Sequence, residues 1–261
     1  MIKHYLKVAF RNLMKYKMQS FVSIIGLAVG FTCFALSALW IRYEMTYDNF
    51  HKGSDRIYMV RAHYANEPGT SNFTPYPLME YLQDKMPEIE AVTAFTPHHV
   101  KFRLEETEQE VGMIDADSVF MNFFDIQLLK GTVNFLKSDG QEVAITKEFA
   151  KRLFSKEEDA LGKEVEVGRR VCTLGAIVSG WSRHSNIPYS VLVAARHSPR
   201  WKSGPEQLFI RVRAGMDMDT FRKKISTMDL SDIQKESELS DLLITRISAL
   251  RYSDYVSKID V

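Results

Sequence analysis

The hydrophobic pattern of the chain is dominated by one long apolar run near its start. Residues 21–41 (FVSIIGLAVGFTCFALSALWI) contain no charged residue. A helix of this length spans about 30 Å, which is the thickness of the hydrocarbon core of a bilayer. A helix of a soluble domain normally keeps a polar face, and this run has none. The pattern therefore predicts a transmembrane helix over residues 21–41, with a buried core helix as the alternative.

The residues before this run predict a second helix with a basic side. Apolar residues recur at helical spacing through residues 2–14, while Lys3, Lys7, Arg11 and Lys15 follow one another four residues apart. A helix of this kind lies on a membrane surface with its basic side toward the lipid head groups. We expect residues 1–20 to form an amphipathic helix on the inner leaflet. It is either a lever or docking surface near a cytoplasmic partner, or a topology signal alone.

The charges that flank the run predict its orientation. Five basic residues and no acidic residue precede it, and the first acidic residue of the chain is Glu44. Because basic residues stay on the cytoplasmic side, the N-terminus is expected inside the cell and residues 42–261 outside. A cleaved signal peptide is the rival interpretation, with residues 35–37 (ALS) as a cleavage site. Its apolar region is usually shorter than this one, which favours an uncleaved anchor.

Small residues within the run predict contact with other membrane helices. Gly26 and Gly30 form a G-x-x-x-G pair, and Ser23 and Ser37 are further small residues. Small side chains let two helices approach closely in lipid. We therefore expect Gly26 and Gly30 to pack the span against a neighbouring helix.

After the run, short strand patterns alternate with helix patterns and predict an α+β domain. Strands are expected at 56–64, 100–104, 142–146, 170–178, 189–195 and 207–213. Two more are expected, one that follows the turn at 105–110 and runs through Val111, and one between Gly162 and Gly168. Helices are expected at 75–86, 118–124, 147–154 and 217–228. Thr146 and Asp217 stand where helix N-caps are expected. We expect two subdomains, roughly 45–135 with 190–261, and 136–189.

Charge and cysteine content narrow the class of protein. The formal net charge is +1, but 29 basic and 33 acidic residues follow the first twenty, which gives no support for nucleic-acid binding. Cys33 lies in the apolar run and Cys172 in a predicted strand, so they are not expected to pair. A domain of over 200 residues can bury its own core without disulfides. The composition is typical of a bacterial periplasmic domain.

Catalytic and metal-binding patterns are not found in the sequence. It contains no G-x-x-x-x-G-K-[ST] phosphate loop, no G-x-S-x-G elbow and no H-E-x-x-H pair. His98 and His99 are adjacent and would point to opposite faces of a strand. The aromatic residues Phe120, Phe123 and Phe124 have the spacing of a helix face that packs in a core. We predict that the chain is not an enzyme and holds no metal and no cofactor.

Several segments, in order, resemble one family of membrane proteins. They are 10–13 (FRNL) with Lys15 and Lys17, 47–51 (YDNFH), 55–58 (DRIY), 116–120 (ADSVF), 123–125 (FFD), 128–131 (LLKG), 143–154 (VAITKEFAKRLF), 161–163 (LGK) and 175–178 (GAIV). A basic helix, one span and a large outer α+β domain complete the likeness. The chain thus resembles the MacB/FtsX-type permeases of ABC transporters, with a MacB-like periplasmic core domain.

The resemblance implies a function without bond chemistry. Permeases of this type pair with a cytoplasmic ABC ATPase that uses the ATP, usually as two permeases with two ATPases. Movement driven by ATP is passed to the periplasmic domain for export, extraction or the transmission of force to a periplasmic partner. The implied location is the bacterial inner membrane, and the implied partners are the ATPase, a second permease copy, lipid and a periplasmic protein.

The sequence departs from this family in its number of spans. The family has four or eight, whereas no second apolar run of about 18 residues follows before Val261. We therefore expect the sequence to be an N-terminal portion of a permease. The alternatives are a single-span periplasmic sensor or ligand-binding module, which needs a pocket, and an anchored hydrolase, which needs a catalytic constellation.

Overall fold

The computed structural model covers residues 1–261 and describes all of them except 1, 139, 182–183, 203–204 and 252–261. The chain divides into two compact units, residues 1–46 and residues 47–261. The second unit is called the outer domain below. Each unit is described by itself.

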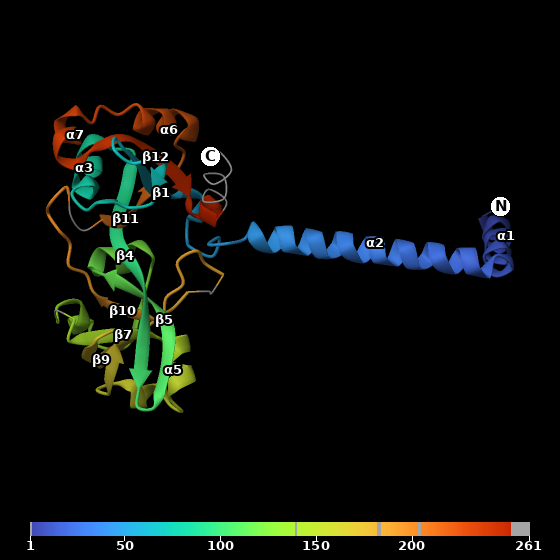
Figure 1. Ribbon diagram of the computed structural model, residues 1–261, viewed down its shortest axis with the longest axis horizontal. Helices are drawn as coiled ribbons and strands as arrows, with labels where there is room; N and C mark the ends of the chain where they lie inside the picture. Colours follow the sequence, from blue (N-terminus) through green and yellow to red (C-terminus); the bar gives the residue numbers. More distant parts are fainter. Residues whose placement is uncertain (1, 139, 182–183, 203–204, 252–261) are drawn as a thin grey trace. The chain divides into compact units, whose positions relative to one another are not determined.

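The first unit consists of two helices. Helix α1 spans Ile2–Lys15 and α2 spans Lys17–Glu44, so α2 begins before the predicted span and ends after it. The chain turns at Tyr16, and α1 leaves the axis of α2 there (Figure 1). The Ser20 hydroxyl donates a hydrogen bond of 3.1 Å to the carbonyl of Leu13 across this corner. With 28 residues, α2 is about 42 Å long, which exceeds the hydrocarbon thickness of a bilayer.

One mixed sheet runs through the outer domain, in the order β12-β1-β11-β4-β5-β10-β7-β9-β6. Its strands are β1 (Ile57–Tyr64), β4 (Ile89–Leu104), β5 (Thr107–Ala116), β6 (Leu128–Gly131), β7 (Glu142–Thr146), β9 (Arg170–Val178), β10 (Val191–Ala194), β11 (Pro205–Val212) and β12 (Leu239–Arg246). The short strands β2 (Thr70–Ser71), β3 (Thr74–Pro75) and β8 (Glu164–Val167) pair at its margins.

The sixteen-residue strand β4 connects two parts of this sheet. Its first half pairs antiparallel with β11, and its second half pairs antiparallel with β5. Figure 1 shows β4 as the long strand that extends from the β11 side of the domain to the β7 and β9 side. The pairs β5–β10 and β7–β9 are parallel, and the other long pairings are antiparallel.

Helices cover both parts of the sheet. They are α3 (Leu78–Lys85), α4 (Ser118–Phe123), α5 (Lys147–Leu153), α6 (Met218–Ser226) and α7 (Ser231–Ser237), with short 3₁₀ turns at Ser54–Arg56, Val133–Leu136, Glu157–Ala160 and Ile247–Ala249. Thr146 and Asp217 cap α5 and α6 as predicted, because each side chain accepts a backbone N–H in the first turn.

Three hydrophobic clusters fill the domain. One lies under α3, α6 and α7, and a second lies under α5 against β7 and β9. The third joins strands from both parts of the sheet, and its centre is aromatic: Phe95, Phe120 and Phe209 are fully buried. Phe120, Phe123 and Phe124 are core residues, as predicted. This third cluster and strand β4 both extend across the two parts of the sheet. The division into the two predicted subdomains therefore stays a prediction.

The predicted α+β class is confirmed. Strands β7 and β9 have the predicted bounds, and β1, β10 and β11 differ by one or two residues at an end. The acidic stretch 105–110 lies at the tip and along the start of the β4–β5 hairpin. There Glu108 pairs with Lys101 and Arg103, which are exposed neighbours across the strand pair.

Candidate functional site: the membrane helix and the junction of the outer domain

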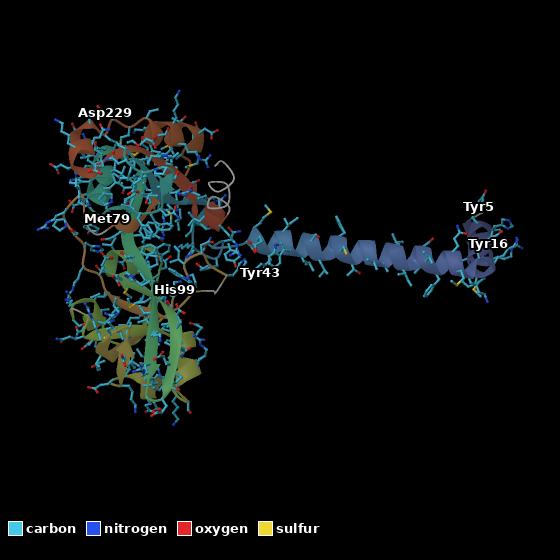
Figure 2. The ribbon with its side chains drawn as sticks, viewed as in Figure 1. Tyr5, Tyr16, Tyr43, Met79, His99 and Asp229 are labelled. Atoms are coloured by element: carbon cyan, nitrogen blue, oxygen red, sulfur yellow. The ribbon has the colours of Figure 1, made fainter. Side chains whose placement is uncertain are left out.

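Helix α2 is long and apolar enough to cross a membrane, by length and composition. Its apolar side chains are exposed within the first unit and project on every side of the helix (Figure 2). The hydroxyls of Thr32 and Ser37 donate to the carbonyls of Ala28 and Cys33, one turn earlier. Polar groups satisfied within the helix are compatible with hydrocarbon surroundings. Residues 21–41, the predicted span, lie entirely within α2.

The two glycines predicted to pack the span lie one turn apart on α2. A Cβ built on Gly26 or Gly30 would meet no atom within 4 Å among the described residues of the chain. The face of α2 that carries these two glycines is therefore not covered by any other described part of the chain. Packing against another membrane helix stays a prediction.

The basic side of α1 is only partly described. Arg11 and Lys15 are exposed, and the Lys15 ammonium lies 5.5 Å from the ring of Tyr16 at the corner with α2. The side chains of Lys3 and Lys7 lie outside the described residues. Tyr5 and Phe10 are exposed on the same helix, so α1 presents both apolar and basic side chains to its surroundings. An interfacial location stays a prediction.

A buried carboxylate stands at the start of the outer domain. Asp48 is completely buried, and its backbone has a φ of 56°, in the left-handed region. It accepts hydrogen bonds from the Ser185 hydroxyl at 2.5 Å, the Asn186 backbone N–H at 3.0 Å and the Asn186 side-chain amide at 2.7 Å. Its own N–H donates to the carbonyl of His184. Asp48 thus fastens the first residues of the domain to a loop 137 positions later in the chain.

Aromatic packing surrounds this carboxylate. The ring of Tyr47 lies 3.9 Å from that of His184 and beneath the guanidinium of Arg251. His51 has its Nε2 3.7 Å from Asp48 and packs against Phe124 and Trp181. We call residues 47–51 together with 184–187 the junction. Both of its segments are held by buried polar bonds and by ring contacts.

The junction continues into the aromatic core through Trp181. Its indole N–H donates to the carbonyl of Ile187 at 2.9 Å, and its ring packs edge-on against Tyr189 at 4.6 Å. The Tyr189 hydroxyl donates to the carbonyl of Ser179, and burial raises the pKa of this phenol. The hydroxyl therefore remains a donor throughout the physiological pH range.

A second, partly buried polar network fixes the segment between β10 and β11. His197 bonds through Nδ1 to Glu206 at 2.8 Å and through Nε2 to Asp117 at 3.2 Å, and its ring stacks on Tyr76 at 4.0 Å. Burial opposes charge on the imidazole, but the two carboxylates outweigh it and raise the pKa of His197 to about 9. Burial also opposes charge on Asp117, yet the bond from His197 keeps the pKa of that carboxyl below its usual value.

Neither polar network has the form of a catalytic centre. Among the described residues, no group of three or more His, Cys, Asp or Glu side chains is arranged so that it could hold a metal ion. His98 pairs with Asp115 at 3.1 Å on the sheet, and His197 bridges two acids with both ring nitrogens engaged. These side chains serve to hold segments together.

Sequence reasoning did not single out the junction. Residues 47–51 carried part of the family likeness, but nothing local marks Asp48 as buried or names residues 185 and 186 as its partners. A signal does exist. An aspartate followed by Asn49 begins a turn, and Asp and Asn are the non-glycine residues that best tolerate positive φ.

Comparison with known proteins supports the fold and the class. The MacB-like periplasmic core domain family matches residues 20–228. No protein with a curated function matches the chain. A permease-protein domain from Porphyromonas gingivalis has a TM-score of 0.58 at 20% identity, covering 75% of this chain and 92% of that one.

Two further structures have the same fold at 12% identity. The extracellular domain of the noncanonical ABC-type transporter YknZ from Gram-positive bacteria has a TM-score of 0.54, covering 72% of this chain and 99% of that one. The periplasmic region of MacB from Actinobacillus actinomycetemcomitans has a TM-score of 0.51, covering 77% and 94%. Together with α2, these findings describe a membrane-anchored protein with a domain outside the membrane. The chain belongs to the MacB-like periplasmic core domain family, among the MacB/FtsX-type permeases of ABC transporters, which are transport components.

Proposed function

We propose that the chain is a permease subunit that couples a cytoplasmic ATPase to movement of the periplasmic domain, for export, extraction or mechanotransmission. The observation that carries this proposal is the junction. Helix α2 ends at Glu44, and the buried carboxylate of Asp48 follows four residues later. Three residues, 45–47, lie between the end of α2 and Asp48, and none of them is glycine or serine.

The physical argument concerns how force passes along the chain. A glycine- or serine-rich linker would absorb a displacement of the helix end, because its end-to-end distance is variable. Here the short connection leads to three hydrogen bonds on a buried carboxylate and to rings packed on both sides. A shift or rotation of the end of α2 would therefore be applied to residues 184–187 and, through Trp181, to the aromatic core.

The proposed surroundings follow from the family and from the charges. The N-terminus and α1 lie on the cytoplasmic side of the bacterial inner membrane, with Lys3, Lys7, Arg11 and Lys15 toward lipid head groups. The separate ATPase binds and hydrolyses ATP, and the chain holds no cofactor of its own. A second permease copy packs along Gly26 and Gly30, and a periplasmic protein is a further partner.

The test is co-reconstitution of the full-length protein with its ATPase in lipid nanodiscs. We expect the permease to bind the ATPase and to change its turnover. Hydrogen exchange in residues 184–187 should differ between the nucleotide-free state and the state trapped with ATP and vanadate. If the protein neither binds an ATPase nor alters its turnover, the proposal is wrong.

A pair of insertions tests the junction itself. Four residues (GSGS) inserted between Thr46 and Tyr47 should abolish the ATP-dependent change in exchange at 184–187. The same insertion between Glu105 and Glu106, at the tip of the β4–β5 hairpin, is the matched control and should preserve it. Equal responses of the two insertion variants would show that the short connection is not needed for coupling.

A further inference from the structure

A cavity of about 320 Å³ lies in the part of the outer domain that contains β7 and β9. It is lined by residues of β4, β5, β8, β9 and β10, by the β8–β9 turn, and by the loops before β7 and after β10. Its polar lining comes from five side chains: His98, Asp115, Arg169, Arg170 and Arg196. This volume is at the lower end of the range for small-molecule sites.

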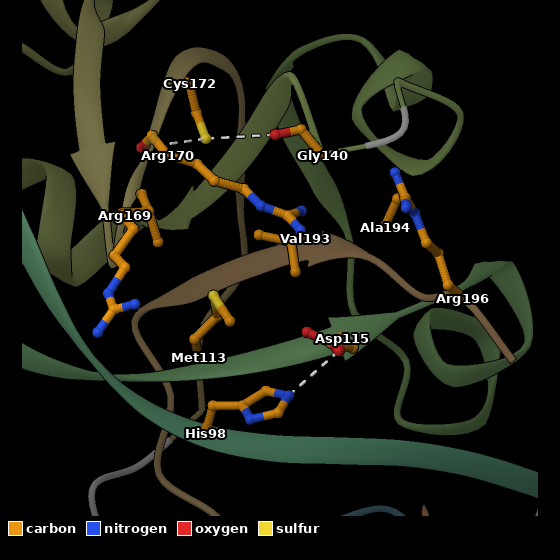
Figure 3. A pocket seen from close by; sticks show the side chains of 11 residues that line it. His98, Met113, Asp115, Gly140, Arg169, Arg170, Cys172, Val193, Ala194 and Arg196 are labelled. Carbon is orange, nitrogen blue, oxygen red and sulfur yellow. Dashed lines mark hydrogen bonds and ion pairs between the residues drawn. The ribbon is translucent and has the colours of Figure 1, made fainter. Parts of the chain in front are cut away.

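Three arginines line this cavity. Arg169 and Arg170 come from the β8–β9 turn and the first residue of β9, whereas Arg196 follows β10. Figure 3 shows Arg169 and Arg196 on opposite sides of the cavity, with the Arg170 side chain extended between them. Among the described residues, neither Arg169 nor Arg170 forms an ion pair with a carboxylate.

Asp115, the carboxylate among the described lining residues, is already engaged. Asp115 pairs with His98 at 3.1 Å, and the dashed line in Figure 3 marks this contact. Arg169 and Arg170 have no carboxylate partner among the described residues, so they leave the described part of the lining with an excess of positive charge. Neighbouring like charges repel one another, and an anion beside these two guanidinium groups would relieve the repulsion.

The remaining walls are apolar. Met113, Val167, Val193 and Ala194 line the cavity, together with the buried thiol of Cys172. This thiol donates to the carbonyl of Gly140 at 3.2 Å, and burial raises its pKa, so it stays protonated and acts as an uncharged wall. An apolar floor beneath a cationic rim fits a ligand that has a charged head and a short apolar body.

We propose that this cavity binds a small organic anion, a carboxylate or phosphate group attached to an apolar body of about the size of a phenyl ring. Arginine suits this role because its planar fork binds the oxygens of a carboxylate or phosphate in pairs. The site goes beyond the coupling function proposed above. It would let the outer domain recognise a ligand without any contribution from the ATPase.

The test is calorimetric titration of the full chain in nanodiscs of zwitterionic lipid, with no ATPase present. The probes are benzoate, phenyl phosphate, inorganic phosphate and the uncharged benzamide. We expect benzoate and phenyl phosphate to bind, inorganic phosphate to bind more weakly, and benzamide not to bind. Stronger binding of phenyl phosphate than of benzoate would assign the site to phosphate monoesters, and the reverse order would assign it to carboxylates.

Variants locate the binding. Arg170→Gln should lower the affinity for benzoate and phenyl phosphate roughly 10- to 100-fold, the loss expected when charge-assisted hydrogen bonds are removed. Arg169→Gln should also weaken it. Arg222→Gln removes the same charge from an exposed position on α6 and should leave the affinity unchanged. These arginines are exposed, so folding should survive each change, which circular dichroism checks.

A site-specific signal completes the design. The methyl resonance of Met113, assigned by its loss in Met113→Leu, should shift when benzoate is added. Three results would overturn the proposal: no binding of either aromatic anion up to about 10 mM, equal binding of benzamide, or full affinity in Arg170→Gln. Because no ATPase takes part, failure here leaves the coupling proposal standing.

Discussion

The buried carboxylate of Asp48 provides a quantitative test of the junction. Its three neutral donors lie within 3.0 Å, and the side chain is completely buried. A hydrogen bond to a charged group contributes about 1.5–3 kcal/mol, and a buried donor left without an acceptor costs about 1–3 kcal/mol. Such terms are not additive within one network. Removal of the carboxylate should therefore destabilise the outer domain by about 3 kcal/mol.

The backbone at this position lets two effects be separated. Asp48 has a φ of 56°, a conformation that glycine adopts freely, that Asp and Asn tolerate, and that costs alanine about 1 kcal/mol or more. Asp48→Gly removes the carboxylate without this backbone cost, and Asp48→Ala adds it. Asp48→Asn keeps the shape and the φ preference but removes the charge. We expect stability to fall in the order wild type, Asn, Gly, Ala.

The assay is urea unfolding of the full chain in detergent, followed by tryptophan fluorescence, because Trp181 packs on His51 beside the carboxylate. A loss of about 3 kcal/mol corresponds to a fall in melting temperature of about 6–12 °C for a domain of this size. Ser185→Ala removes one donor and should cost about 1 kcal/mol. Wild-type stability of both Asp48→Asn and Asp48→Gly would refute the claim that this network holds the junction.

Four further outcomes follow from the structure. His197 has a pKa raised to about 9 from 6.5, so its contribution to stability is complete below about pH 6.5 and is lost as the pH rises through about 9. The melting temperature of the wild type should therefore fall over this pH range relative to that of His197→Gln. Parallel curves of melting temperature against pH for the two proteins would contradict the assignment. A Cβ at Gly112 would lie 2.2 Å from the carbonyl oxygen of Pro188, so Gly112→Ala should cost about 2–3 kcal/mol in urea unfolding. Gly69→Ala meets no atom within 4 Å but has a φ of 89°, so it should cost only the backbone strain of about 1 kcal/mol. Gly26→Leu with Gly30→Leu should weaken association of α2 in a bilayer, measured by energy transfer between labelled copies, and Ile24→Leu is the control for the opposite face. Arg11→Gln with Lys15→Gln should lower the binding of an α1 peptide to anionic vesicles by about 2 kcal/mol, and an unchanged affinity would argue against an interfacial role.

The sequence predicted the elements whose local pattern is unambiguous. The sequence of strand β9 is a largely apolar segment that begins at an arginine and is followed by Ser179 and Gly180. Strand β7 ends at Thr146, which caps the helix that follows directly. These features depend on neighbours within a few residues. The span was found for the same reason, although its helix extends to Lys17 and Glu44 because a helix does not end where the hydrocarbon does.

The sequence was less informative where burial does not alternate. The first half of β4, from Ile89, lies between β11 and the helices and is buried at four consecutive positions, 92–95, so it lacks the period of a half-exposed strand. Strand β4 also contains Pro97, at the start of the half that pairs with β5, and a proline within a sequence segment argues against predicting a central strand there. Strand β12 and helix α7 were not predicted either, because both follow short polar segments.

The candidate sites depend on contacts between distant parts of the chain. Asp48 meets Ser185 and Asn186 across 137 and 138 positions, and the cavity draws its arginines from the β8–β9 turn, from β9 and from the segment after β10. A single sequence contains each of these residues without showing that the fold brings them together. The tertiary pairing of β4 with β5, and of β5 with β10, is what places them at common sites.

The chemistry of the junction also bears on why its anchor is polar. Apolar side chains of the same total volume could stabilise the junction as well as a buried carboxylate with its donors, since burial of a charge carries a large desolvation cost. Apolar contacts, however, tolerate sliding, whereas a carboxylate with three directed donors is satisfied in one position of residues 185 and 186 only. In the proposed coupling, a displaced helix end must move the loop instead of slipping past it. Ser185→Ala provides the discriminating case because it removes one directed donor at a cost of only about 1 kcal/mol. If it keeps most of the stability but loses the ATP-dependent exchange change at 184–187, the directed bond serves the transmission of force more than the fold.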